Sequence, residues 1–435
     1  MKKLFLNLMF ASLMLLAPAQ VGAKETTSAD DKALAEQIRN DKSLDEVVDL
    51  AHKLLAKGFF AGSGYSQVWS RDMNTFVEAA LDVVPAKDVR GALLVFFALK
   101  QPNGEAIDGY VTKDQYTWEE NHPYYSEFAP NHVAFKNTVE TDQETSTIQA
   151  LYKYVKKTGD KSILTEKVGD RTVTEHIRDM INFLLRERFS EKYGLIYGAM
   201  TADWGDVQPL TADVVDINDD TYFAIDAYDN AMLIIALDNM KEMGIATKAD
   251  MKLRKSLAKN VRKYLWDEKR QKIRPHVYLD KSPIPEGFDE EELYCHGGTA
   301  IAIEAGLLTK KEIATVNSAM VRNVKLSGMP SIGLTLYPPY PEGFFHGGMG
   351  NLYNYQNGGD WTWFGGRMIQ QLVRNGFVKE AYEEIRPMID RVIKHQAFYE
   401  WWGMGCTPSG SGEFKGSAGV LVKAIEMMRE WSKDK

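Results

Sequence analysis

The chain has 435 residues, of which 44% are hydrophobic and 26% are charged, and its formal net charge at pH 7 is −8. This composition is ordinary for a globular protein and excludes a disordered or fibrous chain. An acidic chain without a basic stripe is a poor candidate for binding nucleic acid or an anionic membrane surface, so we expect neither as a partner.

The N-terminus has the pattern of a secretory signal peptide. Two lysines precede an apolar run over 4–16, and small residues follow up to Ala23. The run is too short to span a bilayer, and no other stretch approaches 18 uncharged apolar residues, so we expect no membrane insertion once the signal is removed. We predict a signal peptide over 1–23 and export, with the bacterial periplasm as the compartment. The mature chain then has a net charge of about −10.

Helical periodicity dominates the rest of the sequence. We expect an N-terminal linker over 24–42, followed by one domain over 43–435. Three helix starts have the capping-box pattern, in which Ser or Thr is followed three residues later by Glu: Ser43 with Glu46, Thr172 with Glu175, and Thr309 with Glu312. The expected helices cover 43–57, 70–83, 86–99, 142–158, 173–188, 226–243, 247–266, 297–305, 309–323, 362–375, 376–395 and 417–432.

The helices are of two kinds. The segment 229–243 is apolar around most of its circumference and belongs in an interior, whereas 248–266 carries lysines and arginines along one side and resembles an outer helix. Twelve helices in six consecutive pairs, with members of both kinds, are what a double ring of helices requires. We therefore predict an all-α fold of the (α/α)6 toroid type.

Long loops rich in glycine, proline and aromatic residues separate the helices. Connections of this length are uncommon in compact domains unless they build a functional site. In a ring of helical hairpins, alternate loops emerge on one face, where they can converge. The loops cover 101–138, 194–225, 270–296, 327–361 and 396–416.

The stretch YSQVWSRDMNTF places Trp69, Arg71 and Asp72 at a helix start. An arginine and an aspartate can together hold the vicinal hydroxyls of a sugar through charge-assisted hydrogen bonds, while the tryptophan forms an apolar wall. The alternative is a first-turn aspartate favoured by the helix dipole, with the tryptophan in the core.

The stretch MTADWGDVQPL places Asp203, Trp204 and Asp206 in a loop. Burial against an aromatic face raises the pKa of a carboxyl group and suits it to general acid catalysis. The alternative is an Asp-Gly turn with a capping carboxylate.

Near the C-terminus, Glu400 lies among four aromatic residues that include Trp402. A glutamate in such surroundings is either paired with an arginine for structural reasons or placed to activate water. Glu413, in the Gly/Ser-rich loop that follows, is the alternative candidate, and it could also be only a helix cap.

The stretch NYQNGGDWTWFGGRMIQQL, over 354–372, combines glycines with polar and aromatic residues. Gly358 and Gly359 would let the backbone approach a ligand closely, and Asp360, Trp361 and Trp363 would supply a hydrogen-bonding edge and stacking faces. Core packing is the alternative for some of the aromatic residues. Further candidates in and just before the stretch are His346, Gln356 and Asn357.

Metal sites have little support in the sequence. The eight histidines form no H-E-x-x-H motif or close Cys/His group, so we expect no zinc site and no cofactor. Asp216, Asn218 and Asp220 have the alternate spacing of a calcium loop, but Thr221 and Ala227 replace the glycine and glutamate that an EF-hand requires. Loop capping is the simpler interpretation, with an irregular calcium site as the alternative.

Cys295 and Cys406 are the only two cysteines in the sequence. In an oxidising compartment they could form a disulfide, and two buried free thiols are the equal alternative.

The order of the motifs resembles that of a known family. W-x-R-D near the start, D-W-G-D in the middle, Y-x-N-G-G-D-W before a helix and F-Y-E-W-W before a final S-A-G-V-L helix are similar to motifs of the six-hairpin, (α/α)6-barrel glycosidases. The alkaline/neutral invertase family is the nearest in appearance, followed by trehalase and glycogen-debranching glucosidase relatives. The resemblance covers most of the mature chain.

The resemblance implies a glycoside hydrolase that uses no cofactor, in which Asp206 is the general acid and Glu400 the general base. It also implies that the sugar is contacted by Trp69, Arg71, Asp72, Asn357, Gly358, Gly359 and Trp361. Invertase-type members usually have His-Asn before the double glycine and Ser after it, whereas this chain has Gln356, Asn357 and Asp360. This departure weakens the case for a fructoside, and a glucosyl substrate is our expectation.

The implied mechanism is hydrolysis with inversion of configuration, in which the acid protonates the glycosidic oxygen and the base activates water. Two other functions fit a helical ring of this kind. A sugar epimerase would rely on a histidine pair, for which His296 and His346 are the candidates, and a non-catalytic glycan-binding protein would use the carboxylates only to bind sugar. A small-molecule carbohydrate is the expected partner in all three cases, and the sequence predicts no oligomeric state.

Overall fold

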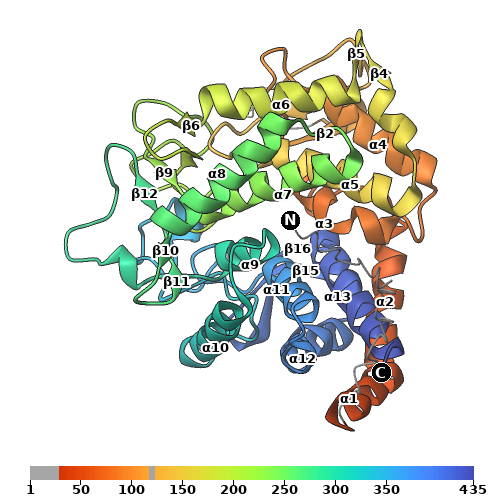
Figure 1. Ribbon diagram of the computed structural model, residues 1–435, viewed down its shortest axis with the longest axis vertical. Coiled ribbons are helices and arrows are strands. Elements are labelled where there is room, and N and C mark those ends of the chain that lie inside the picture. The colour runs from red at the N-terminus through yellow and green to blue at the C-terminus, as the bar shows by residue number, and fades with distance from the viewer. Residues whose placement is uncertain (1–28, 117–122) are drawn as a thin grey trace, which may run out of the picture.

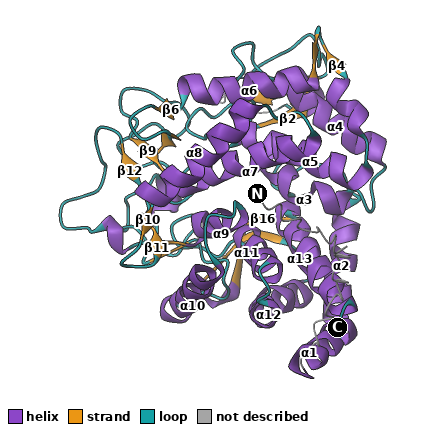
Figure 2. Ribbon diagram, in the orientation of Figure 1, coloured by secondary structure: helices purple, strands orange, loops and turns teal. Residues whose placement is uncertain are grey.

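The computed structural model describes residues 29–116 and 123–435, so the signal peptide predicted over 1–23 lies outside the described residues. Within these ranges the chain is rich in helix, and its strands are short (Figures 1 and 2). The α-helices are α1 (Ala29–Asn40), α2 (Lys42–Leu55), α3 (Ser70–Ala80), α4 (Ala86–Leu99), α5 (Gln143–Thr158), α6 (Val173–Glu187), α7 (Ala227–Met243), α8 (Lys248–Tyr264), α9 (His296–Glu304), α10 (Lys310–Ser327), α11 (Thr362–Arg374), α12 (Val378–His395) and α13 (Lys415–Lys433).

The strands lie in the connections between the helices and pair antiparallel. The sheet β1-β2-β3 aligns Trp69 with Gly109 and Gly109 with Phe135, which joins the start of α3 to the loop between α4 and α5. The strands are β1 (Val68–Trp69), β2 (Gly109–Thr112), β3 (His132–Phe135), β4 (Lys167–Val168), β5 (Arg171–Thr172), β6 (Phe189–Ser190), β7 (Leu195–Ile196), β8 (Gly198–Ala199), β9 (Phe223–Ile225), β10 (Trp266–Asp267), β11 (Lys272–Ile273), β12 (Val277–Tyr278), β13 (Tyr294–Cys295), β14 (Leu336–Tyr337), β15 (Tyr399–Gly403) and β16 (Thr407–Gly412).

Six helices pack against one another in chain order. α3 packs on α5, α5 on α7, α7 on α9, α9 on α11 and α11 on α13, and α13 packs in turn on α3. Each of these helices also contacts a neighbour from the remaining set: α2 and α4 contact α3, α4 and α6 contact α5, α8 contacts α7, α10 contacts α9, α12 contacts α11, and α2 contacts α13. In Figure 1 the first set lies around the centre of the view, with α4, α6, α10 and α12 farther out.

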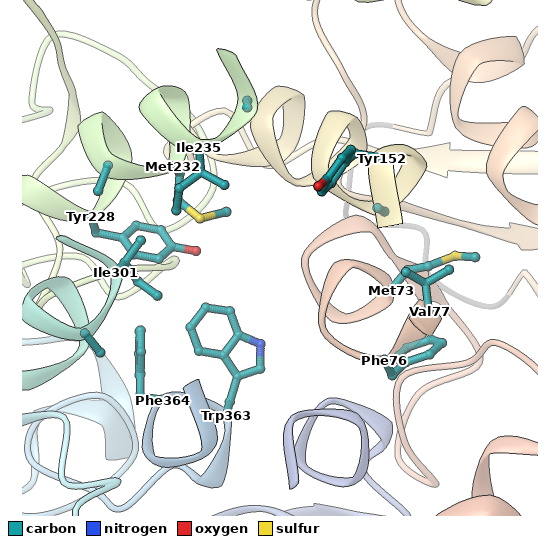
Figure 3. Close-up of a cluster of buried hydrophobic side chains, with 14 of the residues drawn as sticks. Met73, Phe76, Val77, Tyr152, Tyr228, Met232, Ile235, Ile301, Trp363 and Phe364 are labelled. Atoms are coloured by element: carbon teal, nitrogen blue, oxygen red, sulfur yellow. The ribbon is translucent and has the colours of Figure 1, made fainter. Parts of the chain in front are cut away.

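The two kinds of helix expected from the sequence are confirmed. Nearly all of α7 is buried, because apolar residues cover most of its circumference, whereas α8 buries only Asp250, Leu257 and Val261. The side chains of the first set meet in one hydrophobic core, part of which is drawn in Figure 3. There, α3 contributes Met73, Phe76 and Val77, α5 contributes Tyr152, α7 contributes Tyr228, Met232 and Ile235, α9 contributes Ile301, and α11 contributes Trp363 and Phe364.

A glycine sets the distance between α3 and α13. A Cβ atom added at Gly419 would lie 2.4 Å from the Cα atom of Phe76. Because any larger residue would push the two helices apart, this glycine allows the last helix to pack against the third.

The twelve predicted helices are all present, and the structure corrects the linker predicted before them. The segment 24–42, expected as a linker, contains α1, which buries Ala35 and Ile38 and packs against α13. Only two buried residues mark its apolar face, which is too weak a pattern to identify a helix from sequence. Among the described residues, no helix has both the length and the apolar character needed to cross a membrane.

The predicted capping boxes are confirmed at Thr172 and Thr309. The third prediction is wrong: α2 is capped by Asp41, which accepts a hydrogen bond from the backbone N–H of Ser43. An aspartate is as good an N-cap as a serine, so the helix starts earlier than the Ser-x-x-Glu pattern suggested. A further capping box, Thr247 with Asp250, begins α8.

Candidate active site

A pocket of about 210 Å³ lies at the N-terminal ends of α3, α5, α11 and α13. Loops far apart in the sequence meet there, as expected from their length and composition. The N-terminal end of a helix favours negative charge, which suits a pocket rich in carboxyl groups. The residues that line it include Tyr65, Trp69, Arg71, Asp72, Asp108, Lys136, Asn137, Glu140, Trp204, Asp206, Tyr355, Gln356, Trp361, Trp363, Glu400 and Phe414.

Glu400, on β15, is buried in the wall of this pocket. Its carboxylate accepts hydrogen bonds from the hydroxyl of Tyr65, at 3.0 and 3.1 Å, and from the backbone N–H of Ser411, at 2.8 Å. Burial raises the pKa of Glu400, these donors lower it, and the charge of Asp206 raises it again, so that the pKa lies above its ordinary value. The alternative of a structural Glu–Arg pair is not what the structure shows.

The β15–β16 hairpin brings Ser411 to Glu400. Gly410 has a φ of +67°, and a Cβ atom there would lie 2.5 Å from Oε2 of Glu400. Because this left-handed conformation favours glycine and the space is closed to a side chain, Gly410 allows the hairpin to fold around the carboxylate.

Asp206 lines the same pocket, and its Oδ1 accepts a hydrogen bond from Nε2 of Gln356 at 3.2 Å. The two carboxyl groups expected to act as acid and base therefore share one cavity. Trp204, in the same loop as Asp206, stacks on Trp363 with 5.2 Å between the ring centroids and 8° between the planes, and packs edge-on against Trp361 at 4.8 Å. These rings give the pocket an apolar wall.

Arg71 is held by two carboxylates. Its Nε and Nη2 donate to the two oxygens of Asp142, both at 2.7 Å, and Nη2 also lies 2.9 Å from Oε1 of Glu140. Burial acts against the ionised form of Asp142, but Arg71 outweighs it and holds the pKa of that carboxyl below its usual range. The guanidinium also lies over the ring of Trp204, with Cζ 5.5 Å from the centroid.

Two carboxyl groups of the pocket titrate near neutral pH. Burial, with the charges of Glu400 and Glu140, raises the pKa of Asp72 to about 7 against the opposing effect of Arg71. Burial, with the charges of Asp206 and Asp142, raises the pKa of Glu140 to about 7 in the same way. Carboxyl groups crowded in a poorly solvated site cannot all ionise at their ordinary pH, so the pocket holds protons near neutral pH.

Several predicted site residues lie outside the pocket. Asp203 is buried behind it and accepts the backbone N–H of Gly298 at 3.0 Å, where it caps α9, and burial raises its pKa to about 7. Glu413, with a side chain 42% exposed, forms an ion pair with Lys57. The imidazole of His346 contacts the carbonyl oxygen of Ala212 at 2.8 Å.

The Asn-Gly-Gly-Asp stretch packs against the protein rather than lining the cavity. Asn357 bonds to the backbone of Tyr340, and a Cβ atom at Gly359 would lie 2.3 Å from the carbonyl oxygen of Tyr355. Asp360 forms a fully buried ion pair with Arg391 at 2.9 Å. Gly358 does not line the pocket either. Trp402, another predicted sugar contact, also lies outside the pocket lining, and the guanidinium of Arg391 lies over its ring.

The pocket also contains residues that the sequence did not single out. Tyr65 begins the YSQVWSRDMNTF stretch, in which Trp69, Arg71 and Asp72 were the candidates. Glu140 precedes a helix start without a recognisable motif, and Asp108 and Lys136 flank the strands of the β1-β2-β3 sheet. A signal was present for Tyr355, which belongs to the aromatic stretch before α11.

The described residues include no group of histidine, cysteine, aspartate and glutamate side chains arranged to hold a metal ion. Asn218 accepts the backbone N–H of Asp220, as loop capping requires. Cys295 and Cys406 are both free thiols, so the disulfide alternative is excluded in this structure. Neither His296, which is buried and contacts Asn323, nor His346 lines the pocket.

Comparison with known proteins gives a likeness of fold. No protein-family model matches the sequence, and no curated protein matches it. The fold is similar to that of the GH63 mannosylglycerate hydrolase from Thermus thermophilus, with a TM-score of 0.63 and 11% identity over 87% of this chain and 99% of that chain. It is also similar to a GH78 rhamnosidase of Bacillus sp. GL1 (TM-score 0.57, 13% identity, 88% of this chain and 34% of that chain) and to a rhamnosidase from Klebsiella oxytoca (0.56, 14%, 88% and 64%). The helix-rich fold is therefore one that solved glycoside hydrolases adopt.

Proposed function

We propose that this protein is a glycoside hydrolase built on an (α/α)6 toroid. The cyclic packing order of α3, α5, α7, α9, α11 and α13, each backed by a second helix, supports the toroid. One observation carries the activity: Asp206 and Glu400, which are 194 positions apart in the sequence, line a single pocket with aromatic walls. Paired carboxyl groups beside aromatic faces are the groups that glycoside hydrolysis requires.

In this mechanism Glu400 is the general base. The Tyr65 hydroxyl and the Ser411 N–H both donate to it, which favours and orients its ionised form. The carboxylate accepts a proton from a water molecule as that water attacks the anomeric carbon. Asp206 is the general acid and protonates the glycosidic oxygen as the bond to the leaving group breaks. Attack by water on the face opposite the leaving group inverts the configuration at the anomeric carbon.

The remaining pocket residues bind the sugar in this proposal. Trp69 and Trp361 face its weakly apolar surfaces, and Asp72, Arg71 and Gln356 bind its hydroxyl groups. Substrates are small glycosides or oligosaccharides with a glucosyl unit, and the protein works after export, in the periplasm. The candidates that do not line the pocket, Asp203 and Glu413 among them, take no part in the chemistry.

The test is a panel of gluco-, manno- and rhamno-configured disaccharides, incubated with the wild type and with Asp206→Asn and Glu400→Gln. Proton NMR of the first product anomer reports the stereochemistry. We expect hydrolysis with inversion by the wild type and a loss of about 10²-fold or more in both variants, since each removes a general acid or base. Circular dichroism checks that the variants fold.

Three outcomes would contradict parts of this proposal. Sugar binding without product release would favour a glycan-binding protein. A product that retains the anomeric configuration would exclude the inverting mechanism. Full activity in Asp206→Asn would remove Asp206 as the acid.

A further inference from the structure

The pocket has an uneven distribution of charge. Five carboxyl groups line it, whereas among the described lining residues the cations are Arg71 and Lys136. The free-energy cost of removing a charged ligand group from water is offset only where the group meets an opposite charge or, for an anion, good hydrogen-bond donors. Which sugars can enter therefore depends on whether these two cations are available. The carboxyl groups are those of Asp72, Asp108, Glu140, Asp206 and Glu400.

Arg71 is occupied on two sides. Asp142 binds its Nε and Nη2 and does not line the pocket, whereas Glu140 binds Nη2 and does. The side chain of Glu140 is 9% exposed and that of Arg71 16%. Asp142 therefore compensates the charge of Arg71 from outside the cavity, and Glu140 adds a second negative charge from the side of the cavity.

Lys136 is occupied as well. Its Nζ lies 3.7 Å from Oε1 of Glu105 and 3.9 Å from Oδ1 of Asp108, and its side chain is 5% exposed. Burial acts against its charge, but the surrounding carboxylates, with Glu144 foremost, raise its pKa above the ordinary value. The charge of Lys136 is thus compensated by its own carboxylates, and its ammonium group does not provide an unpaired positive charge for an anionic ligand.

We propose that Glu140 sets the charge selectivity of this pocket: by adding a second carboxylate to Arg71, which Asp142 already pairs, it gives the cavity an excess of negative charge with no uncompensated cation among the described lining residues, so that uncharged glycosides bind and glycosides carrying a carboxylate or phosphate are rejected. This inference rests on the proposed function and narrows its substrate class. Specificity of this kind comes from an unfavourable interaction with the wrong ligand as much as from contacts with the right one. Glu140 acts here as a specificity-determining residue, and the acid and base remain Asp206 and Glu400.

The test compares ligands that differ only in charge. Methyl thioglucoside and methyl thiomannoside, whose sulfur-linked bonds resist hydrolysis, are each paired with the same compound carrying a carboxylate at C6, and binding is measured by calorimetry. For the wild type at about pH 8 we expect the neutral member of a pair to bind at least about tenfold more tightly than its uronate.

The residue is tested by Glu140→Gln, which keeps the shape and removes the charge. We expect the ratio of the two dissociation constants to fall by about tenfold, because the pocket then carries one negative charge fewer and Nη2 of Arg71 no longer faces a carboxylate on the cavity side, while Asp142 still holds the guanidinium. Glu304→Gln is the matched control: Glu304 pairs with Arg367 at 3.0 Å, is 14% exposed, and does not line the pocket. Its ratio should equal that of the wild type.

The wild type alone gives a second test if the Gln variant does not fold. Acidification to about pH 5.5 protonates Glu140 and Asp72, both with a pKa of about 7, while a uronate stays ionised, so the discrimination should shrink. The charged and titratable groups that interact with Glu140 are Arg71, Asp142, Asp206, Asp72, Asp108 and Tyr355.

The outcomes separate this inference from the proposed function. Equal binding of both members by the wild type, or an unchanged ratio in Glu140→Gln, overturns the selectivity and leaves hydrolysis standing. Selective binding of neutral sugars without hydrolysis supports the selectivity and overturns the enzyme. If neither member of any pair binds, both proposals fall.

Discussion

The hydroxyl of Tyr65 donates to both carboxylate oxygens of Glu400, at 3.0 and 3.1 Å, although the two residues are 335 positions apart. Tyr65 lies in the loop before β1, and Glu400 lies on β15 near the other end of the domain. The general base of the proposed reaction is therefore held by a residue from the opposite end of the chain, and its ionisation depends on that contact.

Replacement Tyr65→Phe should shift the acidic limb of the pH–activity profile. A donor to a carboxylate favours the ionised form, so its removal raises the pKa of Glu400, and the ionised base is then lost at a higher pH. We expect kcat/KM to fall by about tenfold near pH 5 and by less near pH 8. The pH dependence of kcat/KM for both proteins checks this, and parallel profiles would show that the contact does not tune the base.

Replacement Glu413→Gln should leave activity within about twofold of the wild type. Glu413 was the alternative base in the sequence, but it is half exposed and pairs with Lys57 outside the pocket. Exposed ion pairs contribute little to stability, so the variant should also fold normally. Steady-state kinetics beside Glu400→Gln make the comparison, and a loss as large as that of Glu400→Gln would move the base to Glu413.

Replacement Asp360→Ala should destabilise the protein. Arg391 would be left buried without its partner, at 1% exposure, and breaking a buried pair from one side costs about 3–5 kcal/mol. Denaturant unfolding measures the loss. Glu383→Gln is the control, because its pair with Lys379 is exposed on α12 and should change stability by less than about 0.5 kcal/mol. If the Asp360→Ala protein is stable but binds sugar more weakly, Asp360 contacts the sugar and its role is not structural.

Replacement Asp72→Asn should stabilise the protein relative to the wild type more at pH 8 than at pH 5. The pKa of Asp72 is about 7 in the folded protein and near 3.8 when unfolded, so the folded state binds more protons between these values and loses stability as the pH rises through them. The amide removes this loss. Unfolding free energies at the two pH values check the sign, and a difference that does not grow with pH would contradict the raised pKa.

The helices could be predicted because their evidence is local. The apolar circumference of the segment 227–243 and the Thr-x-x-Glu starts at Thr172 and Thr309 are read from neighbouring residues. α1 was not predicted because it buries only two residues, and the helix that it packs against, α13, lies far away in the sequence.

The site could be predicted only in part, for the same physical reason. Asp206 and Glu400 stand beside tryptophans, which marks them as unusual carboxylates. Glu140 has no such neighbour, and its place in the pocket depends on Arg71, 69 positions earlier. In the sequence, Asp360 has the glycine and tryptophan neighbours of a ligand contact. In the structure, its carboxylate is instead paired with Arg391 of α12 and is buried away from the pocket.

The packing of α13 on α3 has a consequence for how the protein matures. Contacts between segments more than 300 residues apart carry a high entropic cost and form late. A ribosome that has released the first eleven helices has exposed Tyr65 and Arg71 but not yet Phe414 or the final helix. The pocket is therefore complete only after Phe414 and α13 have been made and α13 has packed on α3, and a chain shortened before Phe414 lacks part of the pocket wall.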